Sequence, residues 1–249
     1  MNRQRCGPLA AWTGALLAGQ CDADSVVRAV SRGDAPHQVG GLPGFDAELV
    51  PLREVLVAWR RRGGPVRLVL PVAGDVRGLA GPASFRSAAL ETGEAVCGPG
   101  LGVTCDVIDH APSSAPPSVL WQAFVIEAQP SDPQPLGDAQ FELTTAVRES
   151  ATALSAADVA GWIDDIAAEL HDARRASEHL NLPPRFPSRA LALLAQAERL
   201  HAVLDLAAQD PTGGAIDRTG IAARAEALRP LSTAVRRARL AGYNALAEQ

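Results

Sequence analysis

The spacing of apolar residues changes partway along the chain, and the first half mixes two patterns. Residues 66–72 form a short apolar run of strand-forming side chains, and apolar and polar residues alternate over 102–109. Elsewhere apolar residues recur at steps of three and four, which is the spacing of one helix face. These patterns predict helices at 8–19, 22–31, 47–62 and 82–92, and strands at 66–72, 102–109 and 119–127.

The last two of these strands are joined by a connection rich in Pro and Ser, at residues 110–118. A connection of this length without a helical pattern favours antiparallel pairing. The first half is therefore predicted to be a mixed β-sheet covered by helices.

The second half has a helical period throughout. In residues 156–176, for example, Val159, Trp162, Ile163 and Ile166 lie on one face and acidic residues lie on another. Breaks are marked by Pro and Gly near residues 181–184, 210–214 and 229–230. The pattern predicts an all-helical bundle with helices at 141–154, 156–176, 188–209, 220–228 and 230–247.

A Pro-rich polar segment, residues 129–138, separates the two halves and has the composition of a linker. We therefore predict an α+β protein with three parts. A helix-covered mixed-sheet module occupies residues 1–128, the linker 129–138, and the helical bundle 139–249.

Composition excludes several function classes. The chain has no lysine, so all 23 basic residues are arginines, as in proteins of GC-rich bacteria. Schiff-base lysines, pyridoxal phosphate anchors and the G-x-x-x-x-G-K-[ST] phosphate loop are thereby ruled out. The net charge is −5, and no basic patch dominates, so we do not expect nucleic acid as a partner. No apolar stretch approaches the length of a membrane span, so we expect no membrane insertion.

The four cysteines have neither redox nor zinc-site spacing, which predicts reduced thiols in a cytoplasmic protein: Cys6, Cys21, Cys97 and Cys105. Glu198 and His201 have the Glu-x-x-His spacing of di-iron bundles, but the second copy that such sites need is missing. We therefore predict no metal and no cofactor.

The segment between the strand at 66–72 and the following helix has the ingredients of an anion site. Glycines there would let the backbone approach a ligand, and the helix near Pro82 would present free N–H groups. Arginines could add forked donors, and Ser and Asp further polar groups. The candidate ligand-binding residues are Gly74, Asp75, Arg77, Gly78, Gly81, Ser84 and Arg86.

These glycines match neither the dinucleotide fingerprint nor the Walker loop, and an ordinary strand-to-helix turn also explains them. Our leading hypothesis is therefore a non-enzymatic protein-interaction or regulatory protein that binds a protein partner. The alternative is a protein or enzyme that binds a small anion through the loop at residues 74–86. No catalytic residue is assigned.

Overall fold

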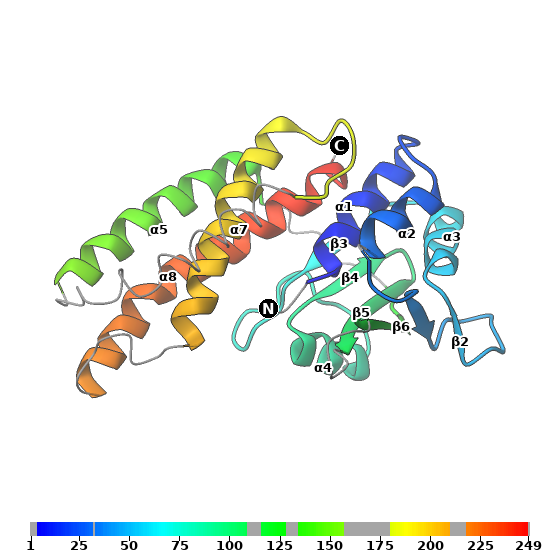
Figure 1. Ribbon diagram of the computed structural model, residues 1–249, viewed down its shortest axis with the longest axis horizontal. Coiled ribbons are helices and arrows are strands. Elements are labelled where there is room, and N and C mark those ends of the chain that lie inside the picture. The colour runs from blue at the N-terminus through cyan, green and yellow to red at the C-terminus, as the bar shows by residue number, and fades with distance from the viewer. Residues whose placement is uncertain are drawn as a thin grey trace. The chain divides into compact units, whose positions relative to one another are not determined.

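The structure is a computed structural model that describes residues 4–31, 33–108, 116–127, 134–156, 180–209 and 218–248. It divides into two compact units (Figure 1). The sheet unit comprises Met1–Pro133, Asn181–Phe186 and Tyr243–Gln249, and the bundle unit comprises Gln134–Leu180 and Pro187–Gly242. The α+β prediction is confirmed: a mixed sheet with helices precedes a helical region.

Within the described residues, six strands form the sheet, in the order β2-β1-β6-β5-β4-β3. β1 and β6 pair in parallel, and the other neighbours are antiparallel. The predicted pairing of the two longest strands is confirmed, with Leu101 opposite Val125 and Ile108 opposite Ser118. The strands are β1 (Gln38–Gly40), β2 (Leu49–Pro51), β3 (Arg67–Val69), β4 (Ala95–Gly98), β5 (Leu101–Ile108) and β6 (Ser118–Val125).

The predicted helix at 47–62 is wrong at its start. Helix α3 spans Arg53–Arg62, and the residues before it form β2. The helical spacing misled because Leu49 points to solvent from the edge strand, whereas Leu52 and Leu56 are buried. β1, β2 and β4 have three or four residues each, too few for a periodicity to show.

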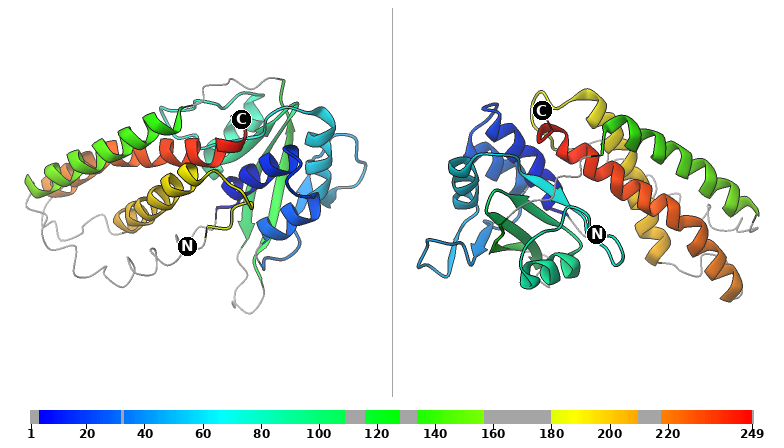
Figure 2. Two further views of the ribbon diagram at one scale, coloured as in Figure 1. Left: turned by 90° about the horizontal axis from the view of Figure 1, so that it is seen from above. Right: turned by 180° about the vertical axis from the view of Figure 1, so that it is seen from behind.

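Three further helices complete the sheet unit, α1 (Cys6–Leu17), α2 (Ala23–Ser31) and α4 (Ala83–Thr92). α1, α2 and α3 lie on one face of the sheet and α4 on the other (Figure 2). Glycines in the strands make room for a large ring on each face. A side chain at Gly98 would collide with Trp59 of α3, and one at Gly102 would lie 2.6 Å from the Phe85 ring of α4.

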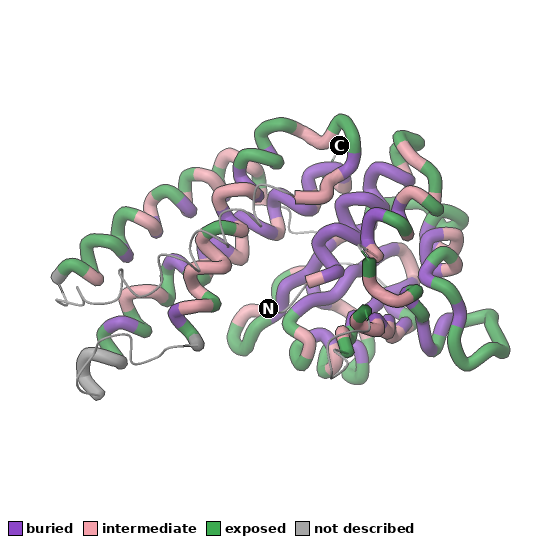
Figure 3. Tube along the Cα trace, viewed as in Figure 1, coloured by how far each residue is buried: buried purple, intermediate pink, exposed green. Residues whose placement is uncertain are grey.

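Helix α1 is buried on all sides. Every residue from Cys6 to Leu16 is buried, and the helix packs against α2, α3, β3 and β4 (Figure 3). Its remaining side is covered by the end of the chain, where η2 (Asn244–Leu246) lies against it. A Cβ at Gly7 would come within 2.8 Å of the Tyr243 ring, so this close packing requires glycine.

The chain end also closes one edge of the sheet. The Asn244 amide accepts a hydrogen bond from the Leu68 N–H at 2.7 Å and donates one to the Leu68 carbonyl at 3.0 Å. Leu68 lies on β3, which is an edge strand in the part of the chain that the structure describes. The Asn244 side chain thus makes both hydrogen bonds that a neighbouring strand would make to Leu68. Because unpaired edge strands can pair with other molecules and aggregate, this contact protects the edge.

Asn181 joins two helices of the sheet unit in a similar way. Its side-chain amide donates to the Ala29 carbonyl at 2.8 Å, and its backbone carbonyl accepts from Trp12 Nε1 at 2.9 Å. The segments Asn181–Phe186 and Tyr243–Gln249 lie in the second half of the sequence, but their contacts place them in the sheet unit.

The described helices of the bundle unit are α5 (Leu136–Ala156), α7 (Ser188–Gln209) and α8 (Arg218–Tyr243). Leu143, Leu193, Val235 and small alanines form their common core. Ion pairs flank it, with Arg237 3.1 Å from Glu142 and Arg239 2.9 Å from Glu198.

Three sequence expectations for this half need comment. The predicted break at 229–230 is wrong, because α8 continues through Pro230, which lies on its exposed face while Leu231 enters the core. The linker predicted for 129–138 ends earlier, since Leu136 to Asp138 form the first turn of α5. Residues 129–133 of that linker, the break predicted at 210–214, and nearly all of the helix predicted at 156–176 lie outside the described residues. Over the described ranges, no helix is long and apolar enough to cross a membrane.

Replacing Asn244 by Ala should lower the free energy of unfolding by about 1–3 kcal/mol, because two hydrogen bonds to the β3 edge are lost. Asn244→Asp should be at least as damaging, since its carboxylate would face the Leu68 carbonyl. Denaturant unfolding measures both variants. Glu248→Gln is the control: it removes the charge of the tail's ion pair with Arg67 and should cost at most about 1 kcal/mol. An unchanged stability of Asn244→Ala would contradict the role of the amide.

Candidate functional site

The proposed anion loop begins with a tight turn. Val72 and Asp75 exchange backbone hydrogen bonds of 3.0 and 2.9 Å, and Gly74 within this turn has φ +84°. Left-handed backbone of this kind favours glycine. The local geometry therefore explains Gly74 without a ligand.

The polar side chains of the turn pair with each other. Arg77 Nε and Nη2 donate to the two carboxylate oxygens of Asp75 at 2.9 and 2.7 Å. The Arg77 guanidinium is about half exposed. The structure thus brings these two predicted residues together, but its arginine fork is directed at a carboxylate of the same turn.

The remainder of the loop leads into α4. Arg86 Nη1 donates to the Gly81 carbonyl at 3.3 Å, and Ser84 is exposed on the first turn of the helix. Gly81 has φ +130°, and a Cβ there would lie 2.8 Å from Ile126. Gly78 also has positive φ. Packing and backbone conformation account for both glycines, and the loop's capacity to bind an anion stays a prediction.

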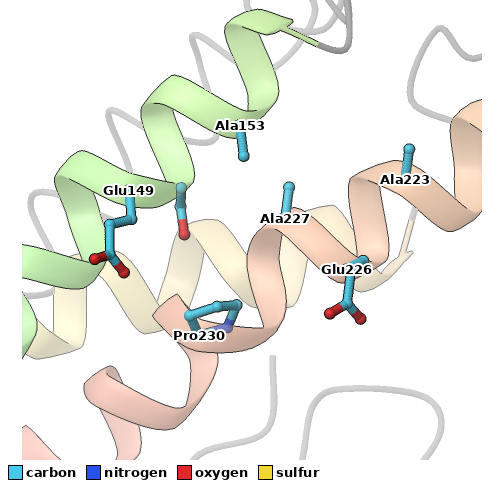
Figure 4. Close-up of a pocket in the computed structure, with 7 residues that line it drawn as sticks. Glu149, Ala153, Ala223, Glu226, Ala227 and Pro230 are labelled. Carbon is cyan, nitrogen blue, oxygen red and sulfur yellow. The ribbon is translucent and has the colours of Figure 1, made fainter.

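A shallow hollow of about 400 Å³ lies in the bundle unit between α5 and α8 (Figure 4). Small-molecule sites combine apolar walls with several convergent polar groups. Most side chains that line this hollow are small, and Glu226, which also lines it, is paired with Arg229 at 2.7 Å. It is a poor candidate for a ligand site. Its lining residues are Glu149, Ser150, Ala153, Ala223, Glu226, Ala227 and Pro230.

Both residues of the Glu-x-x-His pair of α7 lie beside other polar side chains. Glu198 accepts from Arg239 at 2.9 Å, and His201 Nδ1 lies 3.5 Å from Asp205. Burial and the neighbouring Arg239 lower the pKa of His201. Among the described residues, no group of three or more His, Cys, Asp or Glu side chains is placed to hold a metal ion.

The buried cysteines have the properties of unreactive thiols. Burial raises the pKa of Cys97 to about 12. Burial, with the nearby Glu94 carboxylate, also raises the pKa of Cys6 and Cys105. Since the thiolate is the nucleophile, these three side chains are poorly suited to catalysis at neutral pH.

Sequence reasoning missed the loop between β1 and β2, residues 41–48, which projects from the edge of the sheet (Figure 1). Phe45 within it and Leu49 just after it are each 44% exposed. The base is fixed, because Val39, Leu42 and Val50 are buried. Gly41 and Gly44 have positive φ, so the Gly-Gly-Leu-Pro-Gly sequence was a turn signal that could have revealed the loop.

Buried polar side chains form a hydrogen-bonded network next to the start of β1. Trp121 Nε1 of β6 donates to His37 Nδ1 at 3.2 Å, and His37 Nε2 lies 3.1 Å from the Asp34 carboxylate. Arg5 forks onto the same carboxylate at 2.7 and 2.8 Å. The side chains of Asp34 and His37 are 0% exposed. Glu94 accepts from the backbone N–H groups of Arg5 and Cys6 and so holds the start of α1.

Comparison with known proteins gives the family. Two family models cover nearly the whole chain: "Rv1486c-like protein, N-terminal domain" matches residues 6–136, and "Rv1486c-like protein, C-terminal domain" matches residues 137–240. The chain belongs to the Rv1486c-like family. No solved structure matches it.

Its relatives are similar along their whole length. The uncharacterized protein Rv1486c of Mycobacterium tuberculosis is 32% identical, with 96% of this chain and 95% of the relative covered. The uncharacterized protein ML1804 of Mycobacterium leprae is 28% identical with the same coverage. The family relationship thus indicates a protein of two domains, and it does not indicate which activity the family has.

The anion-site hypothesis can be tested on the loop itself. Arg77→Ala and Arg86→Ala should each weaken binding of a phosphate- or carboxylate-bearing metabolite at least about tenfold, because a charged donor is lost. Stability should change by about half a kcal/mol or less, as for other surface substitutions. Calorimetric titration against a metabolite panel measures binding, with the exposed Arg60→Ala as control. Wild-type protein that binds no anion more tightly than about 1 mM would leave this loop a turn.

Proposed function

We propose that this protein is a non-enzymatic protein-interaction or regulatory protein of the bacterial cytoplasm, and that its β1–β2 loop contacts the partner. The observation that carries the proposal is the exposure of Phe45 and Leu49 on a projecting loop. Exposed apolar side chains on a projecting loop offer a surface for a partner, and aromatic residues often dominate binding energy.

The loop is also constructed to present these side chains. The Leu52 N–H donates to the His37 carbonyl at 3.2 Å, which joins the two ends of the hairpin. A side chain on Gly41 would lie 2.6 Å from Gln122 Nε2, so the base of the hairpin packs closely on β6. A fixed base reduces the conformational entropy lost on binding.

The charge around the loop defines the partner's chemistry. Asp46 and Glu48 follow Phe45 in the loop, and both are exposed. A partner that accepts the ring would need an apolar pocket, and basic residues at its rim would complement these carboxylates. We therefore propose a protein partner with a basic-rimmed apolar pocket.

The structure offers less support for ligand binding or catalysis than for an interaction role. The arginines at 77 and 86 make contacts within their own loop, and the hollow between α5 and α8 has few convergent polar groups. The buried thiols have raised pKa values. These observations favour an interaction role over catalysis.

Phe45→Ser should weaken binding to the physiological partner at least about tenfold, because the apolar anchor is removed. The partner is first identified by cross-linking in the native cells with wild-type protein, and its affinity is then measured with purified components. Phe141→Ser is the matched control, since that ring on α5 is 73% exposed and lies in the bundle unit. Both variants should keep wild-type stability.

The pair of variants also locates the interface. Loss of binding by Phe141→Ser with full binding by Phe45→Ser would place the interface on the bundle and refute the proposed surface. Equal binding by wild type and both variants would exclude the exposed rings altogether.

A further inference from the structure

The hydrogen bonds around His37 fix its protonation state. The Trp121 indole N–H can only donate, so His37 Nδ1 must accept and carries no proton. Nε2 then holds the ring's single proton and donates to Asp34. The folded chain therefore holds His37 as the neutral Nε2–H tautomer.

A second proton on His37 has no place in this arrangement. It would bind to Nδ1 and set an N–H group against the Trp121 N–H across 3.2 Å, in a site closed to water. Asp34 already accepts two hydrogen bonds from Arg5. Burial and the Arg5 charge lower the pKa of His37, and Asp34 opposes this shift without cancelling it.

The other groups around the site do not change this conclusion. Asp34 and Arg5 are the charges that act on His37 among the described residues. Glu94 contacts the backbone at Arg5 and Cys6, and Cys105 of β5 lies opposite Trp121 with its pKa raised by burial. Trp121 is the hydrogen-bond partner of His37 Nδ1 among the described residues, and its N–H cannot accept from a protonated Nδ1.

The β1–β2 hairpin is the element that depends on this contact. β1 joins the sheet through three register pairs with β6, and β2 pairs only with β1 among the described strands. The His37 side chain ties the residue before β1 to Trp121, and the His37 carbonyl holds Leu52 after β2. Because this ladder is short, the His37 contact adds to the burial of Val39 and Val50 in holding the hairpin against β6.

We propose that protonation of His37 releases the β1–β2 hairpin from β6, so that mild acidification withdraws the partner-binding loop. The last step rests on the function proposed above, whereas the release of the hairpin does not. The open hairpin takes up a proton near the ordinary His pKa of 6.5, and the docked hairpin resists it. Docking is therefore fully stable above about pH 6.5 and weakens as the pH falls toward the lowered pKa.

Hydrogen exchange of the free protein tests the release. After correction for intrinsic rates, amides of residues 38–51 should lose protection about tenfold between about pH 7.5 and about pH 5, because each pH unit from about 6.5 down to the lowered pKa contributes up to tenfold. Amides of β4 and β5 are the internal reference and should change much less. Equal changes in both regions would overturn the proposal.

Two substitutions separate the titration from simple weakening of the hairpin. His37→Gln keeps a donor and an acceptor but does not titrate, so its hairpin protection should be independent of pH over this range. Trp121→Phe removes the opposing N–H, so the pKa of His37 should rise and the pH response should shrink. A pH response in His37→Gln equal to that of wild type would refute the mechanism.

The ring titration keeps the test decisive if His37→Gln fails to fold. NMR should give a His37 pKa below 6.5 in wild type and a higher one in Trp121→Phe. An unchanged value in that variant would overturn the proposal. Phe45→Ser should retain the wild-type exchange response, so failure of the switch and failure of the proposed interface give different results.

Discussion

Complete burial of α1 is the constraint on which the sheet unit depends. A helix whose residues are buried from Cys6 to Leu16 needs neighbours on every side, and the first half of the chain supplies the sheet, α2 and α3. The remaining side is covered by the chain end, where Gly7 and Gly14 admit Tyr243 and Leu246 at close distance. The apolar surface that this covers is the main gain that offsets the entropy of ordering the chain end.

Several polar groups at the margins of this core are satisfied by specific partners. Glu94 accepts the first N–H groups of α1, and Asn244 satisfies both backbone groups of Leu68 on the sheet edge. Arg5 and Asp34 bring opposite charges into the interior together. Buried charges are tolerated when paired and hydrogen-bonded, but removal of one partner leaves the other exposed to the full desolvation cost. The core therefore depends on a few polar side chains that come from distant parts of the chain.

The sequence predicted the parts of this fold that rest on local periodicity. The α+β class, the β5–β6 pair and the long helix at 188–209 follow from repeated apolar spacing, which is a property of neighbouring residues. The β1–β2 hairpin was missed because Leu49, Leu52, Leu56 and Trp59 keep helical spacing across a strand and a helix. The partners of Asn181, His37 and Asn244 could not be predicted, since each contact joins residues whose proximity only the tertiary fold determines. For the candidate site, the sequence correctly predicted a turn between a strand and a helix. The pairing of Arg77 with Asp75 could not be predicted, because it depends on the conformation of the turn.

The family models and the contacts of the structure divide the chain differently, because contacts join segments that are distant in sequence. The family models meet between residues 136 and 137, yet residues 181–186 and 243–249 belong to the sheet unit by their contacts. Segment Asn181–Phe186 leads directly into α7, and α8 ends at Tyr243, whose ring covers Gly7. Two helices of the bundle thus continue without a break in the chain into segments that complete the α1 core. The chain reaches both of these segments only after it has entered the bundle, so the boundary seen along the sequence differs from the boundary set by contacts.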